Sequence, residues 1–192
     1  MTVNHNAELN SQIVLDASVI INLLGCGYAG DILKAIRSSF SVEERTLKEI
    51  RRHPIPGRSH IDELSALKAA GLLQVHRMSD DAYALYLDLI DDSSPACLGD
   101  GESAAIATAA TLAYGVALDD RKARKVLAKR FPQITLVTTV GMFFAASMQN
   151  SNMKIMMPNI IESAVCHSRM AILKEERHLI DRFIVSKPSS YR

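Results

Sequence analysis

The chain has 192 residues, of which 48% are hydrophobic and 22% charged, and its formal net charge is +1. This composition predicts one globular domain with a substantial core and excludes disordered and highly charged proteins. No stretch approaches the roughly 20 apolar residues that span a bilayer, and the cysteines lack any C-x-x-C spacing. We therefore expect a cytoplasmic protein with no membrane partner, no disulfide framework and no zinc knuckle.

The N-terminal third begins with a polar segment, residues 1–11, that is expected to be disordered. The apolar run Ile13–Leu15 predicts a buried strand that ends at Asp16, with Ser18 as the cap of a helix over 19–24. The next elements, in order, are predicted to be a helix at 31–38, a short strand at 40–42, a helix at 43–52 and a helix at 60–70.

The rest of the chain continues this alternation of strands and helices. Gly71 is expected to end one helix, and residues 102–114, rich in alanine and threonine, predict a tightly packed one. The other elements are expected to be strands at 72–75, 116–118 and 134–137 and helices at 79–90, 121–130, 142–149, 158–166 and 170–184. Such an order predicts an α/β fold with a mainly parallel sheet covered by helices.

The predicted domain boundaries follow from this pattern. We expect a main domain over residues 12–150, a C-terminal helical extension over 151–185 and a loose tail over 186–192. The extension carries apolar side chains that are expected to pack on the domain, on a second subunit in a homodimer, or on an antitoxin-like protein. These side chains are Met153, Ile155, Met156, Met157, Ile172, Leu173, Leu179, Ile180 and Phe183.

Acidic residues recur where the predicted strands end. Asp16 and Asp119 each follow a strand, and Glu102 begins a helix after a loop. Parallel strands place such positions at one edge of the sheet, where Glu49 offers a fourth carboxylate. Clustered carboxylates repel one another unless a cation compensates them, and Mg²⁺ or Mn²⁺ prefers oxygen ligands. The pattern therefore favours metal-dependent hydrolysis of a phosphodiester bond.

Each acid also has a purely structural interpretation. Glu49 alone is typical of a solvated helix residue, and Glu102 alone is typical of a side chain that stabilises a helix dipole. Asp16, and either Asp119 or Asp120, are equally suited to capping a helix. The acids form a site only if the fold brings them together.

At these same residues the sequence resembles the PIN-domain family, within it the small prokaryotic proteins related to toxin ribonucleases. Ile13–Leu23 resembles the family's first strand and acidic position. Gly99–Ala109 resembles its G-x-G-E-x-x-A-I segment, and Leu118–Arg124 its L-D-D-R-x-x-R turn. Thr138–Gly141 falls at a G-T-x-G-like turn, with threonine in place of the first glycine. The similarity extends from Ile13 to Ala146.

The resemblance implies a three-layer α/β/α sandwich and cleavage of single-stranded RNA with Mg²⁺ or Mn²⁺. It also implies the toxin half of a toxin–antitoxin pair. The catalytic acids it implies are Asp16, Glu49, Glu102 and Asp119. The implied metal ligands are Asp16, Glu102, Asp119 and Asp120, where Asp120 competes with Asp119. Supporting polar positions are Ser18, Asp100 and Thr139.

A basic segment follows the last of these acids. We expect it to bind backbone phosphates, although solvated charges on a surface helix explain it equally well. Its residues are Arg121, Lys122, Arg124 and Lys125. Aromatic residues make up only 5% of the chain and Trp is absent, so base stacking is expected to be a minor term.

Two other functions compete with the nuclease. One is a catalytically weak or inactive PIN-fold module that binds nucleic acid or protein. The other is a phosphatase-like hydrolase with Asp16 as covalent nucleophile, which is disfavoured because position 18, where a second acid is needed, is serine.

Overall fold

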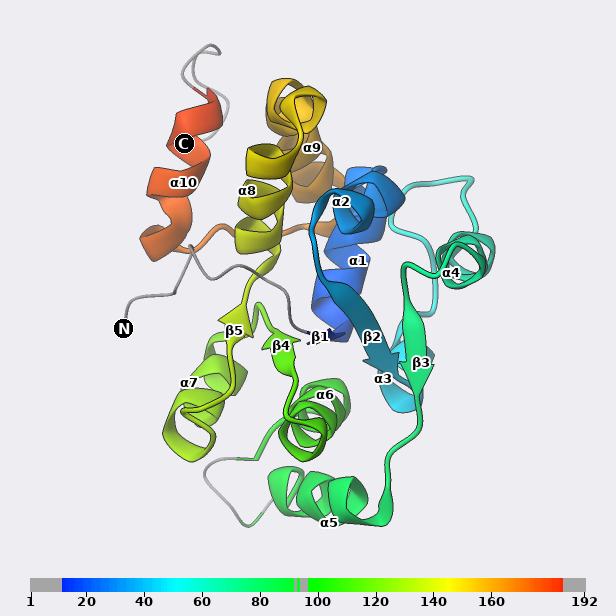
Figure 1. Ribbon diagram of the computed structural model, residues 1–192, viewed down its shortest axis with the longest axis vertical. Helices are drawn as coiled ribbons and strands as arrows, with labels where there is room; N and C mark the ends of the chain where they lie inside the picture. The colour runs from blue at the N-terminus through cyan, green and yellow to red at the C-terminus, as the bar shows by residue number, and fades with distance from the viewer. Residues whose placement is uncertain (1–11, 92, 94–96, 185–192) are drawn as a thin grey trace.

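A five-stranded, wholly parallel sheet organises the protein (Figure 1). The computed structural model describes residues 12–91, 93 and 97–184. The strands lie in the order β3-β2-β1-β4-β5. Their bounds are β1 (Gln12–Leu15), β2 (Ser39–Glu43), β3 (Gln74–His76), β4 (Gly115–Ala117) and β5 (Leu136–Val137). The predicted α/β class and parallel sheet are confirmed.

Helices cover both faces of this sheet, as the predicted sandwich requires. One face packs against α1 (Ala17–Cys26), α2 (Ala29–Ala35), α4 (His60–Ala69), α8 (Thr139–Gln149), α9 (Ser151–Ser168) and α10 (Arg177–Ile184). The other packs against α5 (Asp80–Leu89), α6 (Asp100–Leu112) and α7 (Arg121–Arg130). Figure 1 shows α1, α2, α8 and α9 on one side of the sheet and α5, α6 and α7 on the other. The short α3 (Glu44–Glu49) follows β2 and also packs against α6.

The alternation of side chains along the central strand explains the two cores. Ile13 and Leu15 of β1 enter one core, whereas Val14 enters the other. Successive side chains of a strand point to opposite faces, so β1 is buried from both sides. The segment from Ser103 to Ala109 of α6 is buried throughout, and its small side chains let this helix pack closely, as predicted.

The helices predicted at 31–38 and 43–52 instead span Ala29–Ala35 and Glu44–Glu49, and two further boundaries on the N-terminal side are wrong for local reasons. Asp16, and not Ser18, caps α1, because its side chain accepts the backbone N–H of Ser18. The third strand begins at Gln74 and not at residue 72. Gly71 adopts a φ of 70°, and Leu72 N–H donates to Leu67 at 3.0 Å to close α4, so the chain becomes extended only afterwards.

The C-terminal helices also differ from the prediction. α9 begins at Ser151, with Asn150 as its cap, and continues through Pro158. Burial of Met153 and Met157 against the core outweighs the hydrogen bond that the proline removes. The last helix does not begin at residue 170, because Leu173 is extended and a short 3-10 helix, η1 (Lys174–Glu176), precedes α10.

The predicted domain boundaries stay predictions, and α9 and α10 pack on the core that covers one face of the sheet. Ile160, Ile161, Leu179 and Ile180 belong to the same apolar core as Ile13. The predictions for residues 1–11 and 186–192 fall outside the described residues. Within the part of the chain that is described, no helix has both the length and the apolar character needed to cross a bilayer.

Candidate active site

The acidic residues lie at the carboxyl edge of the sheet, beside its centre. β1 pairs with β2 on one side and with β4 on the other, so the strand order reverses between β1 and β4. In open parallel sheets, ligands bind in the crevice outside the strand ends at this reversal. Asp16 follows β1 directly and Asp119 follows β4 by two residues, which places both at that crevice.

Asp119 is held by three donors from two helices. Its Oδ1 accepts the backbone N–H of Thr139 at 2.9 Å, and its Oδ2 accepts Thr139 Oγ1–H at 2.5 Å and Asn22 Nδ2–H at 2.8 Å. Asn22 also donates to Thr139 Oγ1 at 3.4 Å. α8 begins at Thr139 because Thr138 caps it by accepting Gly141 N–H. The predicted supporting role of Thr139 thus has a geometric basis.

Asp16 is buried at the start of α1. It is 3% exposed, and its Oδ2 accepts Ser18 Oγ–H at 2.6 Å and Ser18 N–H at 3.2 Å. Burial raises the pKa of this carboxyl, and the negative charge of Asp119 raises it further, whereas the hydrogen bonds from Ser18 and Ala17 lower it. Asp16 is therefore both a helix cap and a member of the acidic group.

The glycines of the G-x-G-E segment make room for two carboxylates. Gly101 N–H donates to Glu49 Oε1 at 2.7 Å, and a Cβ on Gly101 would lie 2.6 Å from Glu49 Oε2. A Cβ on Gly99 would overlap the carboxylate of Glu102. Both acids thus lie against the first turn of α6, where the helix dipole favours negative charge. A side chain at either position would have to displace the carboxylate beside it.

Electrostatic repulsion connects the acids of this group. Partial burial raises the pKa of Glu49, and the negative charges of Asp16 and Asp100 raise it further, against the lowering effect of the Gly101 hydrogen bond. Burial also raises the pKa of Glu102, with added contributions from Asp16, Asp120 and Glu49. The fold therefore brings Asp16, Glu49 and Glu102 within electrostatic range of one another, with Asp119 beside Asp16.

The donor chemistry of this group fits a hard divalent cation. Carboxylate oxygens are the ligands that Mg²⁺ and Mn²⁺ take, and burial, followed by mutual repulsion, raises the pKa values of these acids, a cost that a bound cation would relieve. Across residues 12–91, 93 and 97–184, no three or more His, Cys, Asp or Glu side chains lie close enough together to hold a metal ion in common. The acids lie at one edge of the sheet without forming a closed ligand set.

Two neighbouring aspartates already have structural partners. Asp120 caps α7, where its Oδ1 accepts the N–H groups of Lys122 at 2.7 Å and Ala123 at 2.8 Å. Asp100 accepts the hydroxyl of Tyr86. Asp120 still acts electrostatically on Glu102, and Asp100 on Glu49. Their predicted roles as ligand and support stay predictions.

The side chains of the basic segment differ in their exposure to solvent. Arg121, Lys122 and Lys125 are exposed on α7. Arg124 is half-buried, and its Nη1 lies 3.9 Å from Glu175 Oε1. The first three remain available to a phosphate backbone, whereas Arg124 faces the acidic C-terminal segment.

Two residues of the site were missed by sequence reasoning. Asn22 orients Asp119, and its signal was a polar residue within the apolar run Val19–Leu24. Glu176 is 3% exposed; its carboxylate accepts a hydrogen bond from Thr138, and the charges of Arg124 and Asp119 act on it. Burial raises the pKa of Glu176. Its sequence, Lys-Glu-Glu-Arg, resembles any solvated charged turn and gave no signal.

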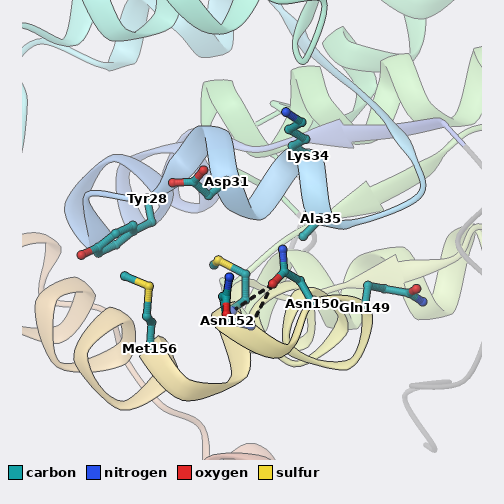
Figure 2. Close-up of a pocket in the computed structure, with 9 residues that line it drawn as sticks. Tyr28, Asp31, Lys34, Ala35, Gln149, Asn150, Asn152 and Met156 are labelled. Atoms are coloured by element: carbon teal, nitrogen blue, oxygen red, sulfur yellow. Dashed lines mark hydrogen bonds between the residues drawn. The ribbon is translucent and has the colours of Figure 1, made fainter.

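A separate hollow of about 510 Å³ lies away from the acidic group around Asp16. Figure 2 shows it between α2, with Tyr28, Asp31 and Lys34, and the corner joining α8 to α9, with Asn150 and Met156. α8 has 11 residues and contacts Asp119 at its first residue, whereas the hollow is at its last. At 1.5 Å per residue the two sites are about 15 Å apart along this helix.

A protein-family model described as a PIN domain matches residues 12–162, which is well over half of the chain. The chain belongs to the PIN-domain family. The matched region contains every acid of the group around Asp16 and ends within α9, so Glu176 lies beyond it. Comparisons with curated proteins and with solved structures give no match. PIN domains are generally nucleases, so membership agrees with a nuclease-like fold.

The acidic group should make stability depend on pH and on metal. The folded PIN domain holds protons on Asp16, Glu49 and Glu102 that the unfolded chain releases at lower pH, so their contribution to the free energy of unfolding falls as pH rises. Asn at position 16 keeps the helix cap and removes one charge. We expect Asp16→Asn to melt above the wild type in EDTA at about pH 7 and to lose this advantage near pH 4.

Thermal melting at both pH values, with and without Mn²⁺, measures this effect. Mn²⁺ should raise the melting temperature of the wild type more than that of Asp16→Asn. If the melting temperature of Asp16→Asn exceeded that of the wild type by more at acid pH than at neutral pH, the repulsion between Asp16 and the other acids would be contradicted.

Gly101→Ala should expel Glu49 while leaving the helix intact. The added methyl group takes the place of the carboxylate oxygen, so we expect Mn²⁺ affinity to fall by about 10- to 100-fold. Alanine favours a helix, so the protein should stay folded. Gly30→Ala in α2 is the matched control, because its Cβ would make only an ordinary contact of 3.6 Å with Leu67. Electron paramagnetic resonance of free Mn²⁺ gives the affinity; equal affinities in the two variants would refute the role of Gly101.

Asn22→Leu should remove one hydrogen bond that orients the carboxylate of Asp119, without unfolding α1. Leucine has a similar size and suits this buried position, but it cannot donate to Asp119 or Thr139. We expect Mn²⁺ affinity, measured by titration calorimetry, to fall by about 10- to 100-fold. Asn152→Leu, on α9, is the matched control. Unchanged affinity in Asn22→Leu would mean that Thr139 alone orients Asp119.

Proposed function

We propose that this PIN-domain protein is a metal-dependent endoribonuclease that cleaves single-stranded RNA. The observation that carries the proposal is the meeting of Asp16, Glu49 and Glu102, with Asp119 beside Asp16, at the reversal of strand order. Acids that repel one another are stabilised by a cation, and a polyanionic substrate also requires positive charge at this place. Family membership supports the same reaction class.

In this proposal Asp16, Glu102 and Asp119 hold Mg²⁺ or Mn²⁺, with Asp120 as a further candidate. The bound cation would activate water and neutralise charge on the scissile phosphate. Ser18 fixes the carboxylate of Asp16, and Asn22 with Thr139 fixes that of Asp119, so two of the ligands are oriented before a cation arrives.

The remaining side chains of the site would bind substrate. Arg121, Lys122 and Lys125 are exposed on the helix that follows Asp119, which suits contacts with phosphates on either side of the cleaved bond. Arg124 would join them only after leaving Glu175. Binding through such cations weakens as salt rises.

We further propose, on the resemblance alone, that the protein acts in the cytoplasm as the toxin of a toxin–antitoxin pair. An antitoxin-like protein and a second copy of the chain in a dimer are the partners this implies. The alternative is a PIN-fold module that binds RNA or protein without cutting; it is favoured by the absence of a closed ligand set in the described residues.

Cleavage of labelled single-stranded RNA in Mg²⁺, Mn²⁺ and EDTA tests the proposal. We expect the wild type to cut only with metal, and Asp16→Asn to be slower by about 100-fold or more, because it removes a ligand charge. Asp31→Asn makes the same chemical change away from the site and should cut like the wild type. Equal cleavage by Asp16→Asn would indicate a contaminating nuclease, whereas RNA that binds and stays intact would favour the non-cutting module.

A further inference from the structure

Two tyrosines stack against each other on α5, beside the acidic group. The ring centres of Tyr83 and Tyr86 are 5.7 Å apart, and their planes differ by 20°. Residues three apart on a helix lie on one face, so both rings project from the same side of α5. Aromatic residues make up only 5% of the chain, so two stacked rings form a local cluster of aromatic side chains.

Arg45 covers this pair from a different segment. Its guanidinium carbon lies 5.4 Å from the ring centre of Tyr83 and 4.9 Å from that of Tyr86. Arg45 belongs to the first turn of α3, which begins where β2 ends at the carboxyl edge of the sheet. A planar cation over aromatic rings is an arrangement that also accepts a further flat ring.

A hydrogen bond and a charge interaction connect the pair to the acidic group. The hydroxyl of Tyr86 donates to Asp100, whose charge acts on Glu49, and Glu49 accepts the N–H of Gly101. Burial and then Asp100 raise the pKa of Tyr86 to about 12, so its hydroxyl stays protonated as a donor. Tyr86 of the pair therefore contacts Asp100, which acts electrostatically on Glu49 of the acidic group.

The two rings differ in exposure. Tyr86 is 5% exposed and fixed by Asp100, whereas Tyr83 is 42% exposed. The buried ring of Tyr86 thus supports the exposed ring of Tyr83. Unpaired bases stack on such surfaces in single-stranded nucleic acids, with little dependence on sequence, and Arg45 adds positive charge that attracts the polyanion.

We propose that Tyr83, supported by Tyr86 and Arg45, is a stacking subsite for an unpaired nucleobase of the RNA that the acids engage. This inference rests on the proposed nuclease function and adds one of its substrate contacts. A base held here would fix the position of the strand relative to the acidic group. The expectation that base stacking is minor is thereby revised for this one position.

Binding measurements with the intact protein test the subsite without cleavage. The probe is a fluorescent single-stranded RNA in EDTA, compared with an abasic oligomer of the same length, by fluorescence anisotropy. Tyr83→Ala should raise the dissociation constant for RNA by about 5- to 100-fold, the loss of one stacked base. It should leave the constant for the abasic oligomer unchanged, because phosphate contacts remain.

Two control variants separate stacking from surface shape. Tyr83→Phe keeps the aromatic face and should bind RNA like the wild type. Leu87→Ala removes an exposed side chain, 46% accessible, one helical turn further along α5, and should also bind like the wild type. Melting curves establish that each variant is folded.

The outcomes distinguish this inference from the proposed function. If Tyr83→Ala binds RNA like the wild type while Asp16→Asn loses cleavage, the subsite is wrong and the nuclease stands. An equal loss for RNA and the abasic oligomer, or a loss shared by Tyr83→Phe, also overturns stacking. If the wild type binds neither oligomer, the stacking subsite is wrong, and cleavage in Mn²⁺ alone decides the nuclease.

Discussion

Carboxylates from separate segments repel one another at the carboxyl edge of this sheet, and the surrounding structure holds them there. Backbone pairing of β1 with β4 brings Asp16 near Asp119, and the contact of α3 with α6 brings Glu49 to Gly101. Burial strengthens the repulsion, because water no longer screens the charges. The free energy for this arrangement comes from the two apolar cores on either side of the sheet.

Space and hydrogen-bond donors, rather than opposite charges, position these acids. Asp16 and Asp119 accept hydrogen bonds from neutral groups of Ser18, Asn22 and Thr139. Gly101 contributes a backbone N–H and an empty volume. Neutral donors orient a carboxylate without cancelling its charge, so the group keeps its capacity to attract a cation.

Sequence reasoning found the sheet and the acids because both have local signals. Short apolar strands predict burial, and an acid after a strand predicts the carboxyl edge, which located Asp16 and Asp119. It failed where tertiary packing decides: α9 continues through Pro158 because Met153 and Met157 are buried. Glu176 escaped because Thr138 and Arg124 are distant in sequence, and the setting of the tyrosine pair escaped because Arg45 and Asp100 come from other segments.

The position of β1 at the middle of the sheet has a consequence for synthesis. Its neighbour β4, which precedes Asp119, leaves the ribosome only after α6 has been made. A nascent chain that stops short of β4 leaves one edge of β1 unpaired and lacks Asp119. An unfinished chain therefore lacks part of the acidic group, and the group is complete only once the second half of the sheet has been added.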